Sequence, residues 1–146
     1  MNNILLSHNQ FLDKYTRLPV DDDGWFGIQC VDLAKLYARE VLGVPLGVFW
    51  GSARTGWYNK SKTFDLKKWE QIKYTPGIKP IRWDIIFYDT GTAGHVAIVH
   101  DATKLDILVL EQNWATGKGK GISYDAINLE TKRDYRDVLG WYRLKK

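Results

Sequence analysis

The sequence contains a single cysteine, a single methionine and four prolines among its 146 residues. One cysteine excludes an internal disulfide framework and a metal knuckle built from several cysteines. No stretch approaches the roughly 20 consecutive apolar residues of a membrane-spanning helix, so we expect no membrane span. Internal repeats, low-complexity tracts and linker-like segments are also lacking. These absences favour a single domain over residues 1–146.

The composition is that of a globular protein with a basic surface. Hydrophobic residues make up 45% of the chain and charged residues 26%, enough to build a core without disulfide or metal staples. The formal net charge is +4 and the pI about 9.1, which suits an anionic partner such as nucleic acid, a membrane surface or a bacterial cell wall. The basic residues are scattered, however, so a solvated surface accounts for the charge equally well.

The first half of the chain has helical patterns and the second half has strand patterns. Residues 8–17 show a loose helical periodicity, and 30–42 read as a largely buried helix that ends at Gly43. Residues 46–63 have little regular pattern, and 67–73 fit a short turn of helix or a strand. Short strands separated by turns are expected at 84–88, 95–100, 107–113 and 139–143. Helices followed by a run of strands predict an α+β domain with an antiparallel sheet.

Cys30 lies where the second predicted helix begins. A thiol at a helix N-terminus faces free backbone N–H groups and the positive end of the helix dipole. Both favour the thiolate, which is the nucleophilic form of cysteine. Cys30 is therefore a candidate nucleophile. The alternative is that it fills the core as a small hydrophobic residue.

His95 is the candidate base among three histidines. It begins a predicted strand directly after a glycine-containing turn, which leaves room beside it for a substrate or a thiol. The period of two places His95 and Ala97 on one face and His100 on the other. His8 is expected in a frayed N-terminal start. A structural role for His95 at the strand start is the alternative.

Glu111 and Asn113 follow a strand whose apolar residues, Ile107 and Val109, lie on the same face. A carboxylate and a carboxamide on a core-directed face are costly unless each has a partner. An imidazole N–H is such a partner, and a Cys–His pair needs a third group to orient the ring. Either residue fits that role. The alternative places both in solvent at the frayed end of the strand.

These candidates fall in three motifs with a familiar order. The segments 29–33 (QCVDL), 94–99 (GHVAIV) and 110–114 (LEQNW) resemble the motifs of the CHAP family, the cysteine, histidine-dependent amidohydrolases/peptidases. Residues 82–87 (RWDIIF) resemble the family's Gly-Asp strand, with Trp83 where glycine is usual, and 140–143 resemble its closing strand. The resemblance spans roughly residues 8–144. It implies a papain-like fold, with N-terminal helices packed on the sheet, and cleavage of bacterial peptidoglycan.

The resemblance also implies a role for each site residue. Cys30 would attack an amide carbonyl, and His95 would take the thiol proton and later protonate the leaving amine. Glu111 would orient His95, with Asn113 as support for the ring or the substrate. The Gln29 side chain and the Cys30 backbone N–H would stabilise the oxyanion. The enzyme would then act as an N-acetylmuramoyl-alanine amidase or a cross-bridge endopeptidase.

An acidic stretch precedes the cysteine. Asp21, Asp22, Asp23 and Asp32 crowd around Cys30, where unneutralised carboxylates would repel one another and disfavour a thiolate. Positions 21, 23, 25, 27 and 32 fall at offsets 1, 3, 5, 7 and 12, the ligand spacing of an EF-hand loop. Phe26 replaces the invariant glycine, so the loop is not an EF-hand. The alternative is an acidic turn in which the aspartates form turns and cap the helix.

Some CHAP endolysins have a calcium loop just before the cysteine, and this stretch is similar. The inferred ligands are the carboxylates of Asp21, Asp23 and Asp32 and the backbone carbonyls of Trp25 and Gly27. Hard oxygen ligands favour Ca²⁺ over zinc. We therefore expect a structural calcium ion.

The sequence also yields expectations about context. Residues 1–8 are too short and polar for a secretory signal, so we expect synthesis in a host cytoplasm and action on the wall as a phage lysin or virion-associated enzyme. The expected partner is peptidoglycan rather than nucleic acid, for a monomer with no separate wall-binding domain. Two alternatives stay open: a non-catalytic, cation-stabilised wall-binding module, and a papain-like deamidase or peptidase acting on proteins.

Overall fold

The computed structural model describes residues 4–15, 30–47, 51–60, 62–111 and 132–146. Helical elements come first along the chain: α1 (His8–Tyr15), α2 (Cys30–Tyr37), the π-helical turn η1 (Ala38–Leu42) and α3 (Ala53–Tyr58). The strands follow: β1 (Trp69–Lys73), β2 (Ile85–Tyr88), β3 (His95–Ala102), β4 (Ile107–Leu110), β5 (Lys132–Arg133) and β6 (Val138–Leu144). The predicted α+β class, with N-terminal helices packed on an antiparallel sheet, is confirmed.

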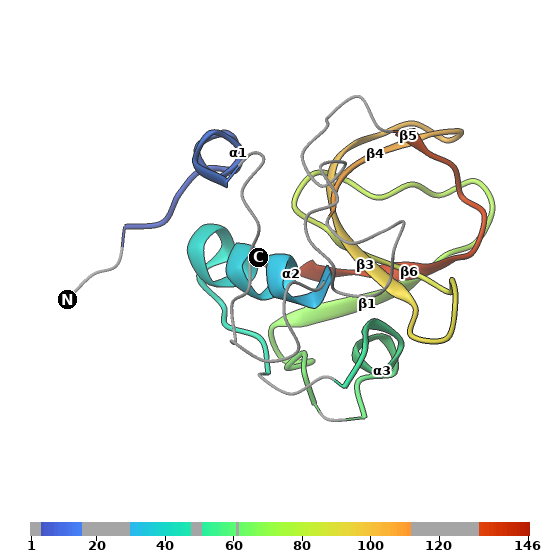
Figure 1. The fold of residues 1–146 in the computed structure, drawn as a ribbon, viewed down its shortest axis with the longest axis horizontal. Helices are drawn as coiled ribbons and strands as arrows, with labels where there is room; N and C mark the ends of the chain where they lie inside the picture. Colours follow the sequence, from blue (N-terminus) through green and yellow to red (C-terminus); the bar gives the residue numbers. More distant parts are fainter. Residues whose placement is uncertain (1–3, 16–29, 48–50, 61, 112–131) are drawn as a thin grey trace.

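The six strands of the described chain form one antiparallel sheet in the order β1-β6-β2-β3-β4-β5. Figure 1 shows that this sheet is strongly curved, with α2 beside it and α1 farther out. Because α2 packs directly on β3, the N-terminal end of the helix is held close to the start of that strand. This packing positions the first two candidate residues of the site.

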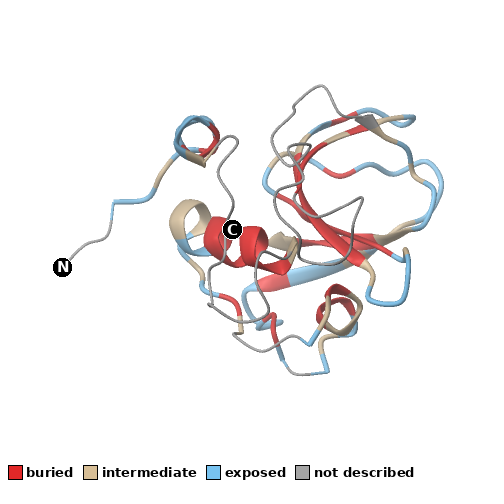
Figure 2. Cartoon of the chain, viewed as in Figure 1, coloured by how far each residue is buried: buried red, intermediate tan, exposed pale blue. Residues whose placement is uncertain are grey.

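The central strands are buried on both faces, as the red strands in Figure 2 show. On β3, Val96 and Ile98 pack toward the helices, in clusters with Val31 and Leu33 of α2 respectively. The alternate residues of β3 pack on the opposite face of the sheet, with Ile107, Val109 and Trp141 among others. The predicted alternation on β3 is therefore confirmed, and His95 belongs by its register to the same face as Ala97.

Two close approaches depend on glycine. Gly43 adopts φ +71° and donates its N–H to the Ala38 carbonyl, which ends the helical run begun at Cys30. Gly140 adopts φ +152°, and a Cβ atom there would lie 2.2 Å from the Ile72 carbonyl oxygen and 2.6 Å from the Trp57 ring. No other residue fits at position 140 without moving β1 or α3.

The structure differs from the expected elements in three places. Residues 46–63, for which no regular element was expected, contain α3, whose N-terminus is capped by the Ser52 hydroxyl accepting from the Thr55 N–H. The strand expected at 107–113 ends at Leu110, whereas Trp69–Lys73 form a strand, which is one of the two elements expected at 67–73. The two-residue β5 was not expected at all. Among the residues described, no helix combines the length and apolar character needed to cross a bilayer.

Candidate active site

Cys30 and His95 meet where α2 begins and β3 begins. Cys30 is half-buried at the first residue of α2, and His95 is the first residue of β3 and only 3% exposed. The Cys30 side chain lies close enough to His95 to help raise the pKa of the imidazole. The predicted nucleophile and base are thus neighbours, although 65 residues separate them in the sequence.

Glu111 completes the arrangement behind the histidine. It follows directly after β4, its side chain is fully buried, and its Oε2 lies 2.8 Å from His95 Nε2. Because Nε2 donates to Glu111, Nδ1 is the ring nitrogen left for the sulfur of Cys30. Of the two residues that fitted the orienting role, Glu111 therefore has the required contact. Asn113 lies outside the described residues.

The charge state of His95 follows from these neighbours. Burial alone would lower the pKa of the imidazole, but its hydrogen bonds to Cys30 and Glu111 and the charges of both raise the pKa from 6.5 to about 9. At neutral pH His95 is therefore an imidazolium held between a sulfur atom and a carboxylate.

Arg133 is also part of this cluster, although no sequence pattern had selected it. Its Nε donates to Glu111 Oε1 at 2.8 Å, and Nη2 of the same guanidinium also donates to that oxygen. It lies on β5, which pairs with β4. The available signal was indirect: a buried glutamate needs more than one compensating group, and the arginines near the last strands were the candidates.

The turn that leads into His95 is held by Arg54 of α3. The guanidinium donates to the carbonyls of Thr92 at 2.6 Å and Gly91 at 3.0 Å, and it pairs with the Asp89 carboxylate. The Arg54 backbone N–H also donates to the Ala93 carbonyl. The helix that the sequence did not reveal therefore fixes the start of β3. On β2, Tyr88 lies opposite His95 in register, with the two rings 6.1 Å apart.

The remaining predicted residues have different outcomes. Gln29 and the expected calcium ligands Asp21, Asp23, Trp25 and Gly27 lie outside the described residues. Asp32 is described and fully buried in the first turn of α2, two residues after Cys30. A search of the described ranges finds no group of three His, Cys, Asp or Glu residues that would hold a metal ion.

A second histidine cluster lies at the other end of the helical run, and it corrects the expectation that His8 belongs to a frayed start. His8 begins α1 and is only 4% exposed. Its Nδ1 lies 2.7 Å from the Tyr37 hydroxyl, and its Nε2 lies 2.9 Å from His100 Nδ1. The short N-terminal helix is ordered because its apolar residues Phe11 and Leu12 pack on α2.

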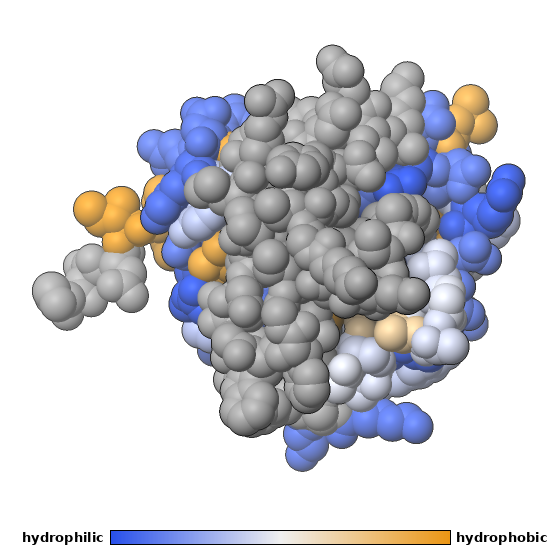
Figure 3. Space-filling model, viewed as in Figure 1, coloured by the Kyte–Doolittle hydropathy of each residue, from blue (hydrophilic) through white to orange (hydrophobic). Residues whose placement is uncertain are grey.

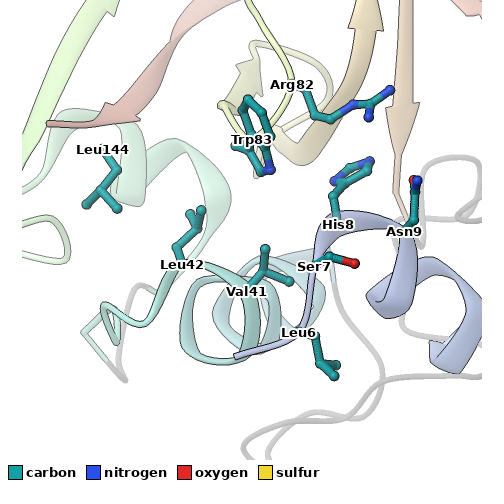
Figure 4. Close-up of a pocket in the computed structure, with 9 residues that line it drawn as sticks. All are labelled: Leu6, Ser7, His8, Asn9, Val41, Leu42, Arg82, Trp83 and Leu144. Carbon is teal, nitrogen blue, oxygen red and sulfur yellow. The ribbon is translucent and has the colours of Figure 1, made fainter. Parts of the chain in front are cut away.

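A shallow groove of about 560 Å³ opens beside this second cluster. In Figure 4, His8, Arg82 and Trp83 border it on one side and Val41 and Leu42 of η1 on the other. It is thus at the far end of the helical run that Cys30 begins. The described residues that are visible in Figure 3 are mostly hydrophilic, with isolated apolar groups.

Comparisons with known proteins yield a family, a relative and a solved structure of similar fold. The CHAP domain model matches residues 20–113. Endolysin PlyTW of Staphylococcus phage Twort is 31% identical in an alignment of 131 residues that covers 84% of this chain and 26% of that protein, so the chain spans about a quarter of its length. The crystal structure of wild-type endolysin LysIME-EF1 superposes with a TM-score of 0.63 at 20% identity, covering 91% of this chain and 60% of that one. The chain therefore belongs to the CHAP domain family.

Proposed function

We propose that the protein is a peptidoglycan hydrolase that cleaves an amide bond through a covalent intermediate on Cys30. The observation that carries the proposal is the placement of His95 between Cys30, at the start of α2, and the buried carboxylate of Glu111. Membership of the CHAP family and the similarity to a phage endolysin support peptidoglycan as the substrate class.

The proposed reaction has two halves. The Cys30 sulfur bonds to the amide carbonyl carbon, and His95 gives its proton to the leaving nitrogen as the C–N bond breaks. This releases the amine and leaves a thioester. A water molecule then attacks the thioester, His95 accepts the water proton, and the carboxylate product leaves as the sulfur departs. Glu111 keeps the imidazole oriented through both halves.

The start of α2 would also stabilise the oxyanion. The first backbone N–H groups of a helix have no partner within the helix, and the Cys30 N–H is one of them. The Gln29 side chain would be the second donor. Each donor of this kind typically lowers the activation free energy by about 2.7–4 kcal/mol. Gln29 and the supporting role of Asn113 remain predictions from the sequence.

Ca²⁺ remains part of the proposal as a structural ion. Asp21, Asp23 and Asp32 would hold it with the carbonyls of Trp25 and Gly27. Oxygen ligands of this kind suit Ca²⁺, and the burial of the Asp32 carboxylate is compatible with a compensating cation. The ion would neutralise the acidic stretch and brace the helix start that carries the thiol.

Incubation of the protein with purified peptidoglycan tests the proposal. Wild type should lower the turbidity of a wall suspension, while Cys30→Ala and Cys30→Ser should not, with circular dichroism unchanged. Mass spectrometry of the products then separates the amidase from the endopeptidase reaction. Undiminished lysis by Cys30→Ala would refute the nucleophile. Cleavage of a protein substrate instead of walls would favour the protein-directed peptidase.

The biological setting is proposed on the same basis. Similarity to an endolysin supports a lysin or virion-associated enzyme of a phage, made in the host cytoplasm and acting on the wall. A basic net charge would help the domain to find anionic wall polymers. We propose that it acts as a monomer, which sedimentation at working concentrations would test.

A further inference from the structure

Glu111 is contacted on both carboxylate oxygens. Oε2 accepts from His95 Nε2, and Oε1 accepts twice from the guanidinium of Arg133. The two contacts therefore divide the carboxylate, and neither cation competes with the other for an oxygen. Both guanidinium bonds end on Oε1, so Arg133 on one oxygen and His95 on the other together fix the rotation of the carboxylate.

The burial of the cluster makes this contact matter. Glu111 is fully buried, whereas the Arg133 side chain is 19% exposed. A buried carboxylate needs compensation, and within the described chain the cations that contact Glu111 are His95 and Arg133. His95 must change its protonation during the reaction, but an arginine stays charged. Arg133 is thus the permanent cation of the cluster.

We propose that Arg133 is a positioning residue for the reaction: it holds the Glu111 carboxylate so that Oε2 faces His95. This inference rests on the proposed function and adds a residue that family membership does not assign. Arg133 touches neither the sulfur nor the substrate, so it acts through Glu111.

The direction of the effect follows from charge alone. Removing a cation raises the proton affinity of every titratable group around it, whichever of the coupled groups binds the proton. The groups that face the cluster are Cys30 from α2, Glu111 after β4 and Tyr88 from β2, with Asp134 and Tyr135 next to Arg133. Loss of the Arg133 charge should therefore move the limbs of the pH–activity profile to higher pH.

Two substitutions separate charge from geometry. In Arg133→Met both are lost, so activity on walls should fall about tenfold or more and the limbs should rise by about one pH unit. In Arg133→Lys the charge stays but the pair of guanidinium bonds to Glu111 Oε1 is lost. The rate of wall lysis should therefore fall while the limbs of the pH–activity profile stay near their wild-type positions. If Arg133 were merely structural, the pH–activity profile would not shift in Arg133→Met while staying in place in Arg133→Lys.

The chain offers two matched controls. Arg136 lies three residues away, is largely exposed and pairs with Asp134, so Arg136→Met should change neither rate nor profile. Arg143 also donates two hydrogen bonds to a buried carboxylate, that of Asp84, although one goes to each oxygen, and it lies away from the site. Arg143→Met should lower the melting temperature without moving the limbs.

The titration of His95 gives a readout that needs no substrate. NMR of histidine-labelled protein should show the His95 resonance titrating at higher pH in Arg133→Met than in wild type, with His8 and His100 unmoved. If the His95 titration shifts in Arg133→Met but wild type does not lyse walls, the proposed function is refuted. The positioning of Glu111 by Arg133 would still stand. Unchanged limbs and an unchanged His95 titration in Arg133→Met would overturn the inference. If that variant does not fold, wild-type activity in Arg133→Lys overturns it.

Discussion

The two buried histidine sites of this molecule differ in charge: one imidazole is protonated at neutral pH and the other is neutral. His95 and His8 are both nearly inaccessible, at 3% and 4% exposure. Burial lowers the pKa of each, but a thiol and a carboxylate raise that of His95 to about 9, whereas His100 and Arg82 help to lower that of His8 to about 4. Burial therefore does not decide whether a histidine is charged; the neighbouring groups do.

The two sites share β3 and use its two faces. His95 is the first residue of β3, and His100 is the extra residue where the register with β4 shifts between Val99 and Asp101. At the His95 end an imidazolium is available for proton transfer. At the His8 end a neutral imidazole links α1 to Tyr37 and to His100. One strand thus supports the proposed chemistry at one end and the docking of α1 near the other.

The largest expected effect is on activity, and it should separate the two sites. His95→Ala removes the proposed base and should lower wall lysis by about 10²–10⁴-fold while the melting temperature changes little. His8→Ala should keep lysis within a few-fold of wild type and lower the melting temperature. Comparable losses of activity in both variants, measured on purified walls at one protein concentration, would remove the distinction between the sites.

The next effect is the pH dependence of stability, which should have opposite signs at the two sites. The His8 imidazole binds a proton near pH 6.5 when unfolded but near 4 when folded, so the unfolded state takes up more protons in that window. Stability should fall as the pH drops from about 6.5 to 4, by up to about 3 kcal/mol from His8. His100, whose pKa is lowered by burial and Arg82, adds in the same direction.

His95 should contribute with the reverse sign. Its folded pKa lies above the unfolded one, so its stabilising contribution is complete below about pH 6.5 and is lost as the pH rises through about 9. Thermal melting across pH 4–10 checks both limbs. His8→Gln should flatten the acid limb alone, and an acid limb as steep as in wild type would show that His8 does not titrate as described.

Calcium removal should affect the Cys30 end of the helical run. If Asp21, Asp23 and Asp32 hold Ca²⁺, a hundredfold excess over the dissociation constant stabilises the fold by about 2.7 kcal/mol. Chelation should then lower the melting temperature and lysis together, and Zn²⁺ should not replace Ca²⁺ well. Asp21→Ala combined with Asp23→Ala should mimic chelation and make the protein indifferent to it. Equal melting and lysis in chelator and in millimolar Ca²⁺ would reduce the stretch to an acidic turn.

The sequence allowed prediction of those parts whose determinants are local. The helix at Cys30, the strands around His95 and the face shared by Glu111 with Ile107 and Val109 follow from periodicity. α3 was missed because its only signals are a capping serine and a few apolar residues in a glycine-rich stretch. Arg133 and the His8 cluster were missed because their partners are distant in sequence, and no local pattern encodes a contact across 22 or 92 residues.

The smallest effect concerns Trp83, beside the groove at the His8 end. Its backbone has φ +79°, a left-handed conformation that costs a non-glycine residue about 1–2 kcal/mol, and its side chain is 48% exposed. Glycine is usual at this position in the motif that residues 82–87 resemble. Trp83→Ala removes the ring and keeps the strain, whereas Trp83→Gly removes both. The glycine variant should therefore be more stable than the alanine variant by about 0.5–1 kcal/mol, although glycine is normally the less stable of the two.

Leu66 is similarly exposed without a positive φ, so there alanine should be the more stable substitution. Chemical denaturation of the four variants measures both differences, and the same order at the two positions would show that Trp83 is not strained. Because Trp83 belongs to the His8 end, none of these changes should move the pH–activity profile set around His95.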